Sequence, residues 1–95
     1  MKVVWLRTAS VALDREYEFL KARNPQGARL VFRRIVATAR RLSEFSSSGR
    51  PGQIEGTREL VVPRCPYVIV YRVGPDTVEI LRVFHTSRNW PELMR

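Results

Sequence analysis

The residue types best suited to chemistry are a lone histidine, a glutamate beside a glycine and a set of arginines. Cleavage of RNA without a metal needs a base for the 2′-hydroxyl, a cation for the phosphorane and an acid for the leaving oxygen. Glu55 or His85 could act as base or acid, and Arg58 could hold the phosphate. Arginines that could neutralise further phosphates are Arg64, Arg82 and Arg88.

His85 and Arg82 also suit structural roles in a strand. His85 shares the alternation of Leu81 and Val83, which fits a hydrogen-bonded residue at a sheet edge as well as a catalytic residue. Arg82 falls on the other alternation, where it could instead anchor a carboxylate of a partner protein. Both interpretations stay open.

Glu55 and Arg58 have an equally simple structural explanation. Glu55 precedes Gly56, so its carboxylate could accept from loop amides or pair with Arg50 or Arg58. Arg58 and Glu59 lie in a predicted strand, where cross-strand ion pairs are common and contribute little to stability.

The charge of the chain is unusual for its size. Its 95 residues include 17 lysines and arginines against 9 acidic residues, a net charge of +8, and only Lys2 and Lys21 are lysines. Arginine presents a planar fork of donors that suits phosphate or carboxylate. We therefore expect the protein to bind a polyanion, either nucleic acid or an acidic protein.

Length and composition limit the alternatives. A chain this short supports one hydrophobic core, so we expect residues 1–95 to form a single domain. The single cysteine, Cys65, excludes an internal disulfide framework and a zinc site built from cysteines. The apolar runs are too short for a membrane span or a signal peptide. These features favour a cytoplasmic protein without a metal or other cofactor.

The first half of the sequence predicts a strand and two helices. A strand is expected within residues 2–7, and Thr8 or Ser10 could cap a helix over about residues 9–23. Asn24 and Pro25 are typical of the start of a second helix, which should end near Leu42. So short a connection predicts an antiparallel hairpin. The apolar stripes are Ala9, Leu13, Tyr17 and Leu20 in the first helix and Ala28, Val31, Phe32, Ile35, Val36, Ala39 and Leu42 in the second.

The second half changes to a strand pattern. Segments 54–62, 67–73 and 77–85 are rich in β-forming residues and are separated by a proline-containing segment and a Gly74-Pro75-Asp76 turn. The order is β-α-α-β-β-β, with a possible final helix after Arg88. We predict an α+β fold in which the helical hairpin covers one face of an antiparallel sheet.

This order of elements resembles the RelE/ParE superfamily, the toxins of bacterial type II toxin–antitoxin modules. The resemblance covers nearly the whole chain and implies a protein that arrests growth when free. It also implies a hetero-oligomer with an acidic antitoxin of the ParD or RelB kind, which silences the toxin. The segments that carry the resemblance are Gly49-Arg50-Pro51-Gly52, Glu55 to Leu60, Tyr67 to Val73 and Ile80 to His85, followed by Arg88 and Trp90-Pro91.

The resemblance implies one of two activities. RelE-like members cut messenger RNA on the ribosome without a metal, whereas ParE-like members poison DNA gyrase. The nuclease branch that matches Arg58 and His85 ends in His-Tyr, but this chain continues from His85 through Thr86 and Ser87 with no tyrosine. The ending therefore favours a ParE-like gyrase inhibitor, with a ribosome-dependent endonuclease as the alternative. A further alternative is a non-toxic module that binds nucleic acid.

The first helix carries the residues that we expect to contact the antitoxin. Leu13, Tyr17, Phe19 and Leu20 would offer apolar side chains beside arginines at the sheet edge. Such a surface suits an acidic antitoxin segment that folds as it binds.

Overall fold

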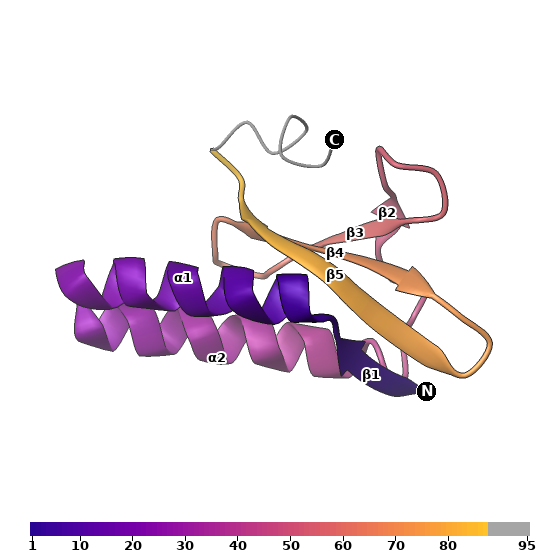
Figure 1. Ribbon diagram of the computed structural model, residues 1–95, viewed down its shortest axis with the longest axis horizontal. Helices are drawn as coiled ribbons and strands as arrows, with labels where there is room; N and C mark the ends of the chain where they lie inside the picture. The colour runs from indigo at the N-terminus through magenta and orange to yellow at the C-terminus, as the bar shows by residue number, and fades with distance from the viewer. Residues whose placement is uncertain (88–95) are drawn as a thin grey trace.

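A helical hairpin and a mixed β-sheet make up the fold (Figure 1). The computed structural model describes residues 1–87, so the helix predicted after Arg88 lies outside the described residues. The chain order is β1 (Lys2–Trp5), α1 (Arg7–Arg23), α2 (Pro25–Arg41), β2 (Arg50–Pro51), β3 (Arg58–Val61), β4 (Tyr67–Val73) and β5 (Thr77–His85). The predicted α+β class and element order are confirmed, with the short β2 as an addition.

The sheet has the strand order β1-β5-β4-β3-β2. Strands β3, β4 and β5 form the predicted antiparallel meander, and β2 pairs antiparallel with β3. Strand β1 pairs parallel with β5, which makes the sheet mixed rather than wholly antiparallel. Turns determine the pairing of strands that are neighbours in sequence, whereas β1 and β5 are separated in the chain by both helices and three strands.

A β-bulge interrupts the pairing of β4 with β5. Val70 pairs with Arg82 and Tyr71 with Ile80, so Leu81 has no partner opposite it in β4. An extra residue in one strand reverses the alternation of side chains beyond it.

The bulge corrects one expectation about His85. Leu81 packs on the sheet face away from the helices, whereas Val83 packs in the core beneath them. His85 therefore shares its alternation with Val83 but not with Leu81, contrary to the pattern expected from sequence.

The two helices begin in different ways. Asn24 caps α2 as predicted, because its Oδ1 accepts a hydrogen bond of 3.0 Å from the Gly27 amide. Helix α1 begins earlier than expected, with Leu6 at the cap position and no side-chain cap. The predicted caps are wrong: Ser10 lies inside the helix, and Thr8 donates its hydroxyl to the Leu81 carbonyl at 3.2 Å.

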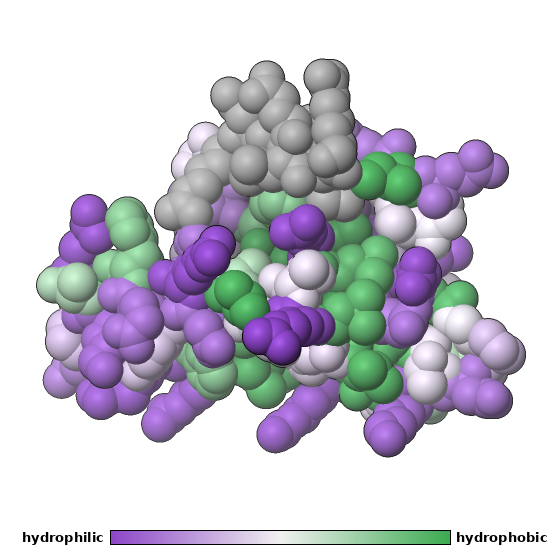
Figure 2. All heavy atoms as spheres, viewed as in Figure 1, coloured by the Kyte–Doolittle hydropathy of each residue, from purple (hydrophilic) through white to green (hydrophobic). Residues whose placement is uncertain are grey.

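The core lies between the helical hairpin and one face of the sheet. The predicted stripes are confirmed, since their members are buried or half-buried. On the face shown in Figure 2, hydrophobic residues gather mainly over the middle of the molecule and hydrophilic residues surround them. The ends of α1 and α2 that meet at Asn24 extend beyond the sheet (Figure 1). The main core residues are Ala9, Leu13, Ile35, Ala39, Leu42, Val62, Tyr67, Ile69, Tyr71, Val78, Ile80 and Val83.

Candidate functional site

His85 ends β5 and is held by its neighbours. Its ring meets the Tyr67 ring edge-on, with centroids 5.2 Å apart. The Ser87 amide donates to Nδ1 at 3.2 Å, and the Ser87 hydroxyl oxygen lies 2.7 Å from the same atom. Because Nδ1 accepts from a backbone N–H, the proton of the neutral ring sits on Nε2. This geometry is that of a hydrogen-bonded histidine at a strand end, one of the two expected interpretations.

A hollow of about 330 Å³ opens between α1 and the end of β5. One wall contains Glu16, whose Oε1 accepts a hydrogen bond of 2.9 Å from the Tyr67 hydroxyl. Of the phosphate-contact candidates, Arg82 lies here, opposite the exposed Arg15 of α1. Sequence reasoning missed Arg15 and Glu16 because only the folded chain brings them to β5. The lining residues are Ala12, Arg15, Glu16, Arg82, Val83, Phe84 and His85.

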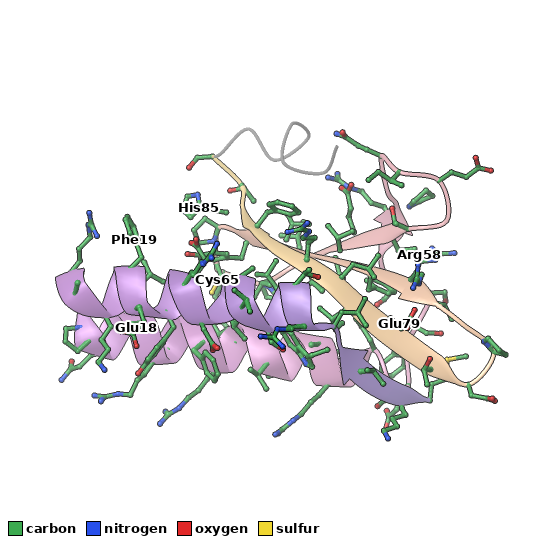
Figure 3. The ribbon with its side chains drawn as sticks, viewed as in Figure 1. Glu18, Phe19, Arg58, Cys65, Glu79 and His85 are labelled. Carbon is green, nitrogen blue, oxygen red and sulfur yellow. The ribbon has the colours of Figure 1, made fainter. Side chains whose placement is uncertain are left out.

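Arg58 lies far from this hollow. Its Nη1 donates to the Gly49 carbonyl at 2.7 Å. Arg58 pairs with Tyr71 of β4, whereas His85 pairs with Tyr67 from the opposite side of that strand. Ordinary strand dimensions therefore separate the two Cα atoms by about 16 Å. Figure 3 shows the two side chains in different parts of the sheet.

Glu55 is exposed in the loop between β2 and β3. Neither expected interaction occurs within residues 1–87, because Arg50 pairs with Glu59 and the Gln53 amide donates to Glu59 as well. The prediction that Glu55 pairs with Arg50 or Arg58 is therefore wrong. Glu55, Arg58 and His85 do not form one site.

Glu59 is the carboxylate that organises this loop. Its side chain is 3% exposed, and its Oε1 lies 3.1 Å from the Arg50 Nη2. Its Oε2 accepts from the Gln53 amide at 3.2 Å. A buried carboxylate without such donors would be strongly destabilising. The cross-strand ion pair was expected, but the near-complete burial of its acidic partner was not.

Arg64 lies in the turn between β3 and β4. The Cys65 amide donates to the Val62 carbonyl at 3.2 Å, and Arg64 has a φ of 58°. The turn places this exposed arginine at the same end of β4 as His85. Arg34 donates to the Arg64 carbonyl at 3.2 Å and so fastens the turn to α2. Arg88, the remaining phosphate candidate, lies outside the described residues.

The candidate antitoxin contacts of α1 differ in exposure. Leu13 is buried in the core, whereas Tyr17 and Leu20 are half-buried. Phe19 is 44% exposed, and the Arg23 guanidinium lies 3.9 Å above its ring centroid. Phe19 therefore offers the most apolar surface of the four (Figure 3).

The arrangement suits the binding of anionic partners better than acid–base chemistry. The three residues predicted for RNA cleavage, Glu55, Arg58 and His85, are dispersed, while Arg15 and Arg82 share one hollow. No group of three or more potential metal ligands occurs among the residues that the structure describes. In the same part of the chain, neither helix is long and apolar enough to cross a membrane.

Comparison with known proteins identifies the family. A family model for the ParE toxin of the type II toxin-antitoxin system, parDE, matches residues 3–90. The chain belongs to this family.

Two relatives agree with the ParE assignment. The chain is 39% identical over 93 residues to Y4kP of Sinorhizobium fredii (strain NBRC 101917 / NGR234), which is named as a candidate toxin. That alignment covers 98% of this chain and 96% of Y4kP. A solved structure of a chromosomal ParDE toxin–antitoxin system from P. aeruginosa matches with a TM-score of 0.84 at 28% identity. That structural match covers 92% of this chain and 97% of the P. aeruginosa chain.

Membership of the ParE family confirms the resemblance seen in the sequence. This chain is a ParE-like toxin of a type II toxin–antitoxin system. A ParE toxin is one component of a two-component module, so its partner is an antitoxin.

Proposed function

We propose that this ParE-like toxin inhibits DNA gyrase and that an acidic antitoxin neutralises it. The observation that carries the proposal is the position of Arg58, which binds the Gly49 carbonyl at a distance from the hollow that holds His85. The predicted phosphate-binding cation, Arg58, is therefore not beside the predicted acid or base, His85, and this separation favours the gyrase-directed branch. Its action on gyrase would place the toxin in the cytoplasm.

Neutralisation follows from charge and from the exposed face of α1. The chain has a net charge of +8, which attracts an acidic partner from a distance. Phe19 is a large apolar side chain that is 44% exposed, and Tyr17 and Leu20 line the space between α1 and α2. An amphipathic antitoxin segment could cover these side chains while its carboxylates pair with nearby arginines.

The test is a DNA supercoiling assay with purified gyrase and purified toxin. We expect free toxin to abolish supercoiling and to cause cleaved DNA to accumulate. The same amount of toxin in complex with its antitoxin should leave gyrase active. Unaffected gyrase in the presence of free, folded toxin would contradict the proposal.

Two variants separate this proposal from the ribosome-dependent alternative. Arg58→Ala and His85→Ala should both keep gyrase inhibition and growth arrest, because neither side chain is assigned a catalytic role. Loss of toxicity in both variants, together with cleavage of messenger RNA by the natural protein, would establish the endonuclease instead. Binding of nucleic acid without growth arrest would indicate the non-toxic module.

A further inference from the structure

A second hollow lies between α1 and α2 on the side of the hairpin away from the core. Its volume is about 500 Å³. The buried residues Leu13 and Ile35 lie on the other side of the hairpin, where they pack against the sheet. We call this hollow the outer groove, and the residues that line it are Asp14, Tyr17, Arg29, Phe32 and Arg33.

Basic residues form a row on α2 along the outer groove. Arg29, Arg33 and Arg40 are four and seven residues apart, so they fall within about 40° of one another around the helix. At the rise of an α-helix the row spans about 16 Å. All three side chains are exposed. Nitrogen-tipped side chains extend from the helices on the side away from the sheet (Figure 3).

Helix α1 adds a basic residue near each end of the groove. Arg7 and Lys21 lie seven residues before and after Asp14, so they share its face of α1. Both are exposed. The acidic residues on this side are Asp14 and Glu18, which leaves an excess of positive charge over the five basic residues of the two helices.

The donors of this surface are available to a ligand. Within residues 1–87, none of the five basic residues belongs to an ion pair or donates a side-chain hydrogen bond. In the same part of the chain, the hydroxyl of Tyr17 has no hydrogen-bond partner. The outer groove therefore suits a ligand that offers acceptors and negative charge at regular intervals.

We propose that the outer groove and the basic residues beside it bind the phosphate backbone of a nucleic-acid duplex. Arg29 and Arg33 would contact phosphates at the groove itself, and Arg40 would extend the contact along the backbone. The inference goes beyond the proposed function and does not depend on it, because the surface needs neither gyrase nor antitoxin to bind phosphates. Duplex DNA and duplex RNA share this chemistry.

The helical surface favours nucleic acid over an acidic peptide. The main-chain groups of α1 and α2 bond within the helices, so the outer groove offers an extended peptide no strand edge to pair with. A helical peptide needs an apolar groove, whereas charged side chains of Asp14, Arg29 and Arg33 line this one. A phosphate backbone needs only the side-chain donors that are present.

The aromatic residues favour a duplex over a single strand. Single strands are held largely by bases that stack on exposed aromatic rings. Tyr17 and Phe32 are half-buried, and their rings meet edge-on with centroids 5.4 Å apart. The Lys21 Nζ lies 5.9 Å from the Tyr17 centroid, over the ring. The rings are thus poor platforms for bases, and a duplex presents its phosphates without exposing base faces.

Fluorescence anisotropy tests the proposal with the full chain and a labelled duplex of about 20 base pairs, prepared once as DNA and once as RNA. The logarithm of the binding constant should fall with the logarithm of salt concentration with a slope of about −3 or steeper, since each neutralised phosphate contributes about −0.9. Binding of either duplex in this way supports the inference, and the tighter one identifies the source of the phosphates. No binding at low salt, or tighter binding of a single strand of the same length, would overturn it.

The double variant Arg29→Gln with Arg33→Gln tests the groove itself. Duplex binding should weaken at least about tenfold, and the salt slope should become shallower by about 2. The matched control is Arg15→Gln with Arg64→Gln, which makes the same change in net charge at exposed sites outside the outer groove. It should lose less than about threefold in affinity. Equal loss in the two double variants would overturn the inference.

NMR of arginine side chains tests the same contact without any substitution. Addition of the duplex to the natural chain should shift the Nε–H signals of Arg29 and Arg33 and leave those of Arg15 and Arg64 unchanged. Unshifted Arg29 and Arg33 signals in a saturated complex would overturn the inference. So would a double variant of Arg29 and Arg33 that loses antitoxin binding but keeps duplex binding, because the groove would then belong to an acidic protein.

The supercoiling assay separates this inference from the proposed function. Gyrase inhibition by a natural chain that binds no duplex would overturn the inference alone. Duplex binding through Arg29 and Arg33 by a chain that leaves gyrase active would support the inference and contradict the proposed function.

Discussion

Gly49 lets the hydroxyl of Tyr71 bond inside the protein. The Gly49 amide donates to the Tyr71 oxygen at 2.8 Å, and that hydroxyl donates to the Ser46 carbonyl at 2.8 Å. A Cβ at position 49 would lie 2.6 Å from the Tyr71 oxygen and 2.9 Å from the Glu59 carbonyl oxygen. The first residue of the Gly49-Arg50-Pro51-Gly52 segment is therefore constrained by packing.

Gly49→Ala should destabilise the protein by about 1–3 kcal/mol, because overpacking must displace Tyr71 or the strand beside it. Urea unfolding followed by circular dichroism measures the change. Gly74→Ala is the matched control, since a Cβ there would come no closer than 3.5 Å to its neighbours. Equal stability of the two variants would show that the loop relaxes without cost.

Glu59 and Glu79 allow an ion pair with a buried carboxylate to be compared with one whose carboxylate is more accessible. The Glu59 side chain is 3% exposed and pairs with Arg50, whereas Glu79 is 30% exposed and pairs with Arg72. Ion pairs with two exposed partners contribute little, but a buried carboxylate depends on every donor that it keeps.

Arg50→Ala should therefore cost about 2–4 kcal/mol, because it leaves the Glu59 carboxylate buried with only the Gln53 amide as a donor. Arg72→Ala should cost less than about 1 kcal/mol. Chemical denaturation of both variants under one buffer condition gives the comparison. Similar losses in the two variants would contradict the distinction between the buried carboxylate of Glu59 and the more accessible one of Glu79.

At the scale of elements, Asn24 both ends α1 and begins α2. Its amide donates to the Leu20 carbonyl at 2.8 Å, and its side chain accepts from the Gly27 amide. Asn24→Ala should lower stability by about 1 kcal/mol through loss of the cap. Ser10→Ala, at the position wrongly predicted as a cap, should change stability by less than about 0.5 kcal/mol. Thermal unfolding separates the two, and a larger effect at Ser10 would contradict the observed helix start.

The helices were predictable because their signals are local. Apolar residues at helical spacing and the Asn24-Pro25 boundary identify the hairpin without knowledge of its partners. The parallel pairing of β1 with β5 and the bulge at Leu81 are determined by contacts across most of the chain. A single extra residue in β5 reverses the expected alternation of side chains beyond it. No local pattern in the sequence indicates this extra residue.

The candidate site was harder to predict for the same reason. His85 and Arg82 were singled out by residue type, and both line the hollow beside α1. Arg15 and Glu16 were missed because they lie on a helix far away in sequence. Arg58 was grouped with His85 by chemistry, yet strand register places them at different ends of β4. Residue types suggested the candidates, whereas register decided which of them meet.

At the scale of the whole molecule, charge acts over distances that salt controls. The protein measures 39 Å along its longest axis and carries a net charge of +8. At 0.15 M ionic strength the Debye length is about 8 Å, so an approaching partner senses only the nearest arginines. At 0.01 M it is about 30 Å, and nearly the whole charge attracts the partner at once.

The rate constant for association with an acidic antitoxin should therefore fall at least about tenfold between 20 and 500 mM NaCl. The dissociation rate constant should change much less, since steering acts before contact and apolar burial at Phe19 resists salt. Stopped-flow mixing or surface-based kinetics across this salt range measures both constants. An association rate that is independent of salt would show that the net charge does not guide the encounter. A salt effect confined to dissociation would instead restrict the electrostatic attraction to ion pairs formed at contact.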